Sequence, residues 1–180
     1  EGLAFHVVEV SVPVLPPGIH YLAVAAGGQH CLGLCSDGSI VPWGDNTYGN
    51  YNVPPLPAGT TYVKVSAGGT HSVALRSDNV IVPWGSAHYW IGSVPQVPSG
   101  LGVKQLVSGG AHLVVLFSDG TVAHWGRDRK DMPRQPPGQP PLQFVQVAGG
   151  DYFNLALLSD GSIVSWGLNQ YGSAEIPAAV

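Results

Sequence analysis

Three histidines recur at one position of a repeated unit, and histidine is the side chain that most often binds metal ions. His30, His71 and His112 are each 41 residues apart. The ligands of one ion lie about 2 Å from it, whereas equivalent positions on neighbouring repeats normally lie much further apart, and the fourth unit has Phe153. We therefore interpret the histidines as structural, with each ring bonded to backbone near a Gly-Gly turn, and expect no metal.

Four aspartates, Asp37, Asp78, Asp119 and Asp160, recur at another position and could suggest paired carboxylates for acid–base chemistry. Each follows a serine and precedes glycine or, in copy two, Asn79, which is the composition of a hairpin turn. The Gly-Gly pairs lack the Lys-Ser/Thr of a phosphate loop, and no Ser/His/Asp arrangement stands out. We expect neither enzyme activity nor a cofactor.

The elements that position these residues follow a 41-residue period. Trp-Gly, Ser-Asp and Gly-Gly each occur four times, and repeats of this length are typical of propeller blades or solenoid turns. We expect one domain over residues 1–180, with repeats at about 20–60, 61–101, 102–142 and 143–180. The Trp-Gly pairs begin at Trp43, Trp84, Trp125 and Trp166, and the Gly-Gly pairs at Gly27, Gly68, Gly109 and Gly149.

Each unit is predicted to form four antiparallel strands. The second alternates, as in His71, Val73 and Leu75, which puts one apolar set on a single face. The third runs to Trp-Gly, whose ring is expected to fill the space between blades, and the fourth is the Pro-bounded segment at residues 51–54. In copy four the Gly-Gly pair arrives after 40 residues, which predicts a one-residue insertion near Asp151. Nothing has helical periodicity, so the predicted fold is an all-β propeller of four 41-residue blades.

Residues 24–49, which run from Val-Ala-Ala-Gly-Gly through Ser-Asp-Gly to Trp-Gly, resemble the repeat of the regulator-of-chromosome-condensation family of β-propellers. The resemblance covers all four copies, and the 41-residue period is similar to the compact repeat of bacterial members, including a secreted propeller that inhibits β-lactamases. It implies a propeller that binds other proteins. Known relatives close with seven blades, so four copies predict an incomplete propeller, half of an eight-bladed dimer, or a ring closed by four blades.

Charged residues make up only 10% of the 180-residue chain, and the formal net charge is −4. Nothing therefore favours binding to a nucleic-acid backbone. Cys31 and Cys35 share one strand face about 13 Å apart at the usual strand rise, which is too far for a disulfide. No run is long enough to span a membrane and no signal-peptide layout is present, so we expect a soluble chain, either secreted or cytoplasmic.

The copies differ most in the loop after each Trp-Gly, and repeat proteins carry specificity where the copies differ on one face. Aromatic rings with polar tips there are typical of protein interfaces, although they could instead pack on their own blades. Copy three gathers basic residues, which fit either a solvated loop or an acidic patch on a partner. The predicted partner-binding residues are Tyr48, Tyr51, His88, Tyr89, Trp90, Arg127, Arg129, Lys130 and Tyr171.

These features predict a protein-binding or scaffolding propeller that uses the loops as its contact face. Three alternatives stay open: guanine-nucleotide exchange or another regulatory role, a carbohydrate-binding lectin whose Trp and Tyr rings stack on sugars, and a structural segment of a large assembly. An open arc of blades would expose apolar faces at both ends, and such faces drive association. Self-association is therefore a further expectation.

Overall fold

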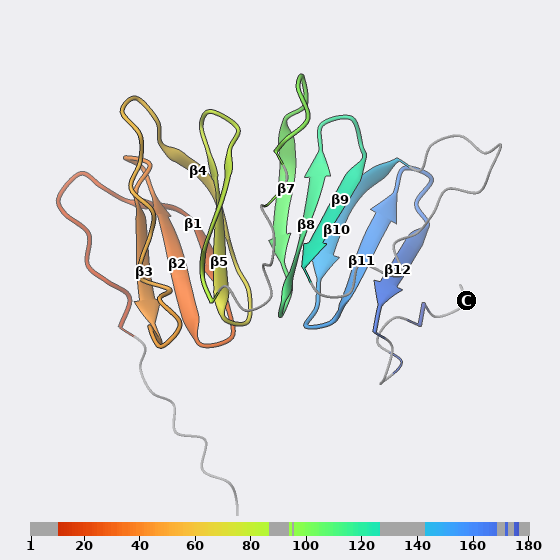
Figure 1. The fold of residues 1–180 in the computed structure, drawn as a ribbon, viewed down its shortest axis with the longest axis horizontal. Helices are drawn as coiled ribbons and strands as arrows, with labels where there is room; N and C mark the ends of the chain where they lie inside the picture. The colour runs from red at the N-terminus through yellow and green to blue at the C-terminus, as the bar shows by residue number, and fades with distance from the viewer. Residues whose placement is uncertain are drawn as a thin grey trace, which may run out of the picture.

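The computed structural model describes residues 11–86, 94, 96–126, 143–168, 172 and 175–176. These residues form four antiparallel sheets, which lie side by side in chain order (Figure 1). Each sheet has its strands in sequence order, so that the second strand is central and pairs with both neighbours. The predicted all-β blades are confirmed, and residues far apart in the chain meet only between neighbouring sheets.

Every strand begins 41 residues after its counterpart in the preceding sheet. The sheets comprise β1 Tyr21–Ala26, β2 His30–Cys35 and β3 Ile40–Gly44; β4 Tyr62–Ala67, β5 His71–Arg76 and β6 Ile81–Gly85; β7 Val103–Ser108, β8 His112–Phe117 and β9 Val122–Gly126; and β10 Phe144–Gly149, β11 Phe153–Leu158 and β12 Ile163–Gly167.

The insertion predicted in copy four is absent. Gly149 ends β10 at the position that Ser108 has in β7. Gly150 donates its amide hydrogen bond to Phe153 at 2.8 Å, as Gly109 does to His112 at 2.9 Å. The glycine pair of copy four therefore lies one position early, and Asp151 occupies the place of the second turn glycine.

The aspartates have the turn role that the sequence predicts. The Asp37 carboxylate accepts hydrogen bonds from the Ser39 amide at 2.9 Å and from its hydroxyl at 2.7 Å. These bonds hold the pKa of Asp37 below its usual range. Asn79 replaces the turn glycine in copy two and is the only described residue other than glycine with a positive φ, at 68°.

The prediction of a fourth strand is wrong where the chain is described, because residues 45–61 form turns and no strand. Proline has no N–H to donate to a sheet ladder, and Pro54, Pro55 and Pro57 interrupt this segment. The segment instead packs against the core between the first two sheets. It is tied there by Tyr62, whose hydroxyl donates to the Pro54 carbonyl at 2.7 Å.

Apolar clusters join each sheet to the next. Leu32 and Ile40 of the first sheet, for example, pack with Ala74 and Trp84 of the second. Trp84 and its counterparts in the third and fourth sheets are buried and face the preceding sheet. The predicted core position of these indoles is confirmed, whereas Trp43 in the first sheet is half-buried.

Backbone hydrogen bonds also join the sheets, at a row of turns that we call the glycine seam (Gly27, Gly28, Gly68, Gly69, Gly109 and Gly110). The Gly28 amide donates to Gly68, and the Gly69 amide to Gly110, each at 3.0 Å. A Cβ on Gly69 would lie 2.7 Å from the Gly110 oxygen, closer than real side chains approach. Only glycine therefore permits this approach of the sheets.

Replacing Gly69 by alanine is expected to lower the free energy of unfolding by about 1 to 3 kcal/mol, because the added methyl group overpacks the junction. Gly102→Ala is the matched control, since a Cβ there would meet its nearest atom at 3.9 Å. Neither glycine has a positive φ. Urea denaturation measures both effects, and equal losses would contradict the steric role of the glycine seam.

Candidate protein-binding surface

The loops after Trp-Gly leave the sheets at the same end as the glycine seam. His30 at the start of β2 is paired with Gly44 at the end of β3. The next residue, Asp45, donates its amide hydrogen bond to the Gln29 carbonyl at 2.7 Å, and Ser86 repeats this bond in the second sheet. We call this end the loop face; it is the lower edge in Figure 1, toward which β3 and β12 point.

Internal hydrogen bonds fix the first of these loops, residues 45–51. The Asp45 carboxylate accepts from the Thr47 amide at 3.0 Å and from its hydroxyl at 2.6 Å. The hydroxyl bond contributes most to holding the pKa of Asp45 below its usual range. The Asn46 side-chain oxygen accepts from the Tyr51 amide at 2.8 Å. The loop therefore closes on itself and presents a defined backbone.

Asn50 anchors this loop to the second sheet. Its side chain is 1% exposed, and its amide nitrogen donates to the Asp45 carbonyl at 3.3 Å. Its backbone oxygen accepts the indole N–H of Trp84 at 2.9 Å. Sequence reasoning missed Asn50, because Ile91 follows it after 41 residues and no repeated polar position marks it.

Tyr48 and Tyr51 place aromatic rings on the loop face, with 44% and 42% of their surface exposed. The Tyr51 hydroxyl donates to the Gly44 carbonyl at 2.8 Å, which fixes that ring beside the end of β3. Both residues lie where the sequence predicts, and their role in binding stays a prediction. The remaining predicted contact residues, His88, Tyr89, Trp90, Arg127, Arg129, Lys130 and Tyr171, lie outside the described residues.

The three repeated histidines are buried between the sheets. His30 Nε2 pairs with the Ser72 hydroxyl at 2.9 Å, and His112 Nε2 with the Asn154 side-chain oxygen at 2.8 Å. The predicted backbone partners are therefore wrong for these two rings, which reach polar side chains of the next sheet instead. No group of three metal-ligating side chains occurs within the described part of the chain. The histidines act as links between blades.

Burial changes the protonation of the histidines. It lowers the pKa of His71 to about 4, with smaller contributions from the nearby His112 and His30. It also lowers the pKa of His30. Both rings are therefore neutral at pH 7, and protonation is disfavoured in the folded chain.

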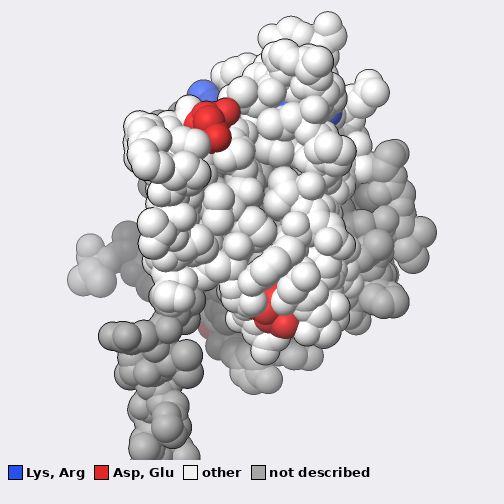
Figure 2. Space-filling model, turned by 90° about the vertical axis from the view of Figure 1, so that its left-hand side faces the viewer, with Lys and Arg blue, Asp and Glu red and all other residues white. Residues whose placement is uncertain are grey.

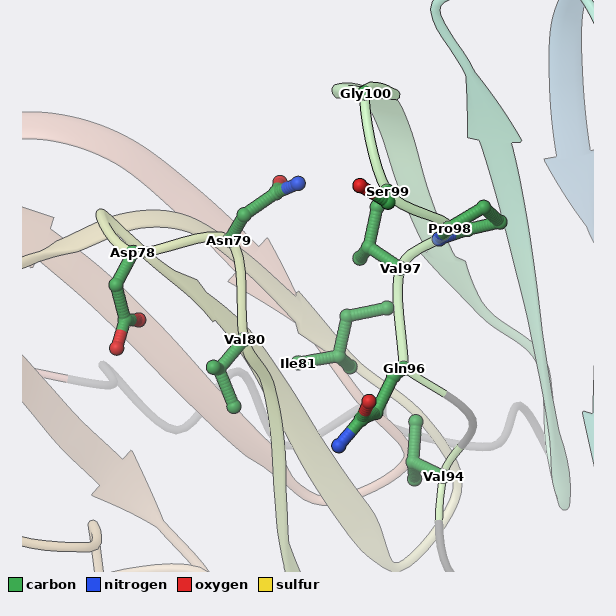
Figure 3. A pocket seen from close by; sticks show the side chains of 10 residues that line it. All are labelled: Asp78, Asn79, Val80, Ile81, Val94, Gln96, Val97, Pro98, Ser99 and Gly100. Atoms are coloured by element: carbon green, nitrogen blue, oxygen red, sulfur yellow. The ribbon is translucent and has the colours of Figure 1, made fainter.

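A pocket of about 350 Å³ opens at the other end of the sheets, between the β5–β6 hairpin and residues 96–100 (Figure 3). Asn79 and Ser99 lie on opposite sides of it, and Ile81 lies between them. The Asp78 carboxylate at its edge is paired with Arg76 at 2.7 Å, which keeps the pKa of Asp78 low. The pocket holds no nucleophile with an adjacent base, so it can accept a side chain but shows no catalytic arrangement.

The model of the regulator of chromosome condensation (RCC1) repeat matches residues 22–50 and 144–173. The chain contains RCC1 repeats. The two matched segments lie in the first and fourth sheets, and the second and third sheets have the same strand pattern. No curated protein matches the sequence closely enough to be counted as a relative.

Solved structures place these RCC1 repeats in a partial propeller. Yeast RCC1 (Prp20) bound to Kap60 is 25% identical, with a TM-score of 0.66 over 87% of this chain. Prp20p from Saccharomyces cerevisiae, in a structure described with its binding to Gsp1p and histones, is 27% identical, with a TM-score of 0.64 over 86%. The ectodomain of receptor kinase CR4 from Physcomitrella patens is 23% identical, with a TM-score of 0.67 over 90%.

The chain spans a little under half of these proteins, 45%, 46% and 44% of their respective lengths. Its four sheets therefore correspond to part of an RCC1 propeller. A search of the described residues found no helix able to cross a membrane.

The buried His71 predicts a specific pH dependence of stability. The unfolded chain takes up a proton on this residue near pH 6.5 and the folded chain only near pH 4. The free energy of unfolding is therefore complete above pH 6.5 and is lost as the pH falls to 4, by about 3 kcal/mol from His71. His71→Phe, which copies Phe153, should remove this loss in chemical denaturation. Equal pH slopes for the two proteins would contradict the assignment.

Proposed function

We propose that the chain is a protein-binding module and that the loop face is its contact surface. The observation that carries this proposal is the loop at residues 45–51, which is held by its own hydrogen bonds while two tyrosine rings stay exposed. Tyrosine provides a large contact area with few rotatable bonds, so a rigid loop that presents it loses little entropy on binding.

The RCC1 comparison supports a protein partner. The two yeast structures above 24% identity describe a protein bound to Kap60 and a protein that binds Gsp1p and histones. For the present chain we propose the class of partner only, another protein, recognised through aromatic contacts. The 41-residue period keeps the resemblance to the compact bacterial repeat as part of this proposal.

Binding is also the role that the chemistry of the described residues favours over catalysis. The repeated aspartates are engaged in hairpin turns, and the repeated histidines are buried between sheets. Neither set is available to a substrate. We therefore propose that the chain acts by presenting a surface and not by carrying out a reaction.

Tyr48→Ala is expected to weaken protein binders at least tenfold, because exposed aromatic anchors typically contribute about 1 to 4 kcal/mol to an interface. Binders are first selected on the wild-type chain from a displayed library of folded domains and are then measured by titration. The melting temperature should stay unchanged, since the Tyr48 ring is largely exposed.

Val63→Ala is the control, because Val63 is 45% exposed and lies in β4 away from the loops. Binders that tolerate Tyr48→Ala but lose affinity with Val63→Ala would place the contact surface elsewhere. Binding of the wild-type chain to arrayed sugars, with no selected protein binder, would contradict the proposal and favour a lectin.

A further inference from the structure

The last sheet exposes apolar positions that are buried between sheets elsewhere in the chain. Ile163 of β12 is 48% exposed, whereas its counterparts Ile40 and Ile81 are 8% and 7% exposed. Leu155 and Leu157 of β11 are half-buried, and the same positions in β2, β5 and β8 are buried. These residues line a shallow apolar groove on the outer face of the sheet, which the described residues leave open.

The first sheet has a complementary open face. Val24 of β1 is 71% exposed, whereas its counterparts Leu106 and Val147 are 8% and 4% exposed and pack against the preceding sheet. Trp43 is half-buried where the other repeated tryptophans are buried. Figure 2, which views this end of the molecule, shows a surface almost free of charged side chains. The face is therefore apolar and uncharged.

The two open faces are the two halves of one internal junction. At the junction between the second and third sheets, Ile81 and Leu106 belong to the same cluster. Ile163 repeats the first of these positions, and Val24 repeats the second. Repeat arrays that end in solvent normally carry polar outer faces, and neither of these faces is polar. A second copy of the chain would supply to each face the half that it lacks.

We propose that two copies of this chain associate head to tail, with the β10–β12 sheet of each copy packed on the β1–β3 sheet of the other. A two-fold axis relates the copies, so both open faces of each are covered and the sheets close into a ring. The junction also matches at the histidine position. Where His30 meets Ser72 inside the chain, Phe153 would meet Cys31, an apolar pair in place of a hydrogen-bonded one.

The glycine seam is the one place where this junction differs from the internal ones. A Cβ on Gly110 would lie 2.7 Å from the Asp151 backbone oxygen, so internal junctions require glycine there. Asp151 has a Cβ at the corresponding position of the last sheet. The two copies therefore lie slightly further apart at the seam than neighbouring sheets do. Asp151→Gly should strengthen the dimer, and a weaker dimer would count against the proposed packing.

Sedimentation equilibrium on the 180-residue chain tests the proposal. We expect a mass twice that of the 18.7 kDa chain and at least a tenfold weaker dimer for Ile163→Lys. Val145→Lys is the matched control, because Val145 is 46% exposed in the same sheet, lies outside the groove and corresponds to Lys104 in copy three. A monomeric wild-type chain, or equal effects of the two variants, would overturn the proposal.

Mixing two variants tests the head-to-tail arrangement itself. Val24→Glu alone should also give monomers, and circular dichroism melting checks that both variants stay folded. A mixture of Val24→Glu and Ile163→Lys should restore a dimer, since one junction is then wild-type on both sides and the other pairs Glu with Lys. If the mixture stays monomeric while both variants are folded, the faces do not meet as proposed.

Discussion

The close approach of backbone at the glycine seam is the contact on which the arrangement of the sheets depends. Each sheet is a short antiparallel unit, and three-stranded units of this size gain stability from packing against a neighbour. Side chains fill most of each junction, but at the seam the amide of one turn donates directly to a carbonyl of the next. Any Cβ there would separate the sheets, break these bonds and loosen the apolar clusters beside them.

The same constraint positions the surface that we propose for binding. Because the seam fixes the end at which β1 turns into β2, it also fixes the end at which β3 releases its loop. The copies are free to vary in that loop, since it leaves the sheet after the last paired residue. The bond from Trp84 to Asn50 then links the core of one blade to the loop of the preceding one. Core packing and presentation of the tyrosines are thus physically connected.

The sequence predicts what repeats and misses what occurs once. The period of His30, Trp43 and the hairpin aspartates was sufficient to predict the sheets, their turns and their buried face. The fourth strand could not be rejected from pattern alone, because Pro54 is compatible with an edge strand as well as with a turn. Asn50 gave no repeated signal, and the partners of the histidines lie 42 residues away, on the next blade. The apparent shift in copy four came from matching Gly149 to a turn glycine when it ends a strand.

Native-state hydrogen exchange at the glycine seam tests the central claim most directly. The amide protons of Gly69 and Gly110 donate across junctions between sheets. We predict that they exchange only through openings as costly as those that release the amides of β5 and β8. The amide of Thr60, bonded within a surface turn, should exchange much faster. Exchange of Gly69 and Gly110 at the rate of Thr60 would show that the seam does not hold the blades together.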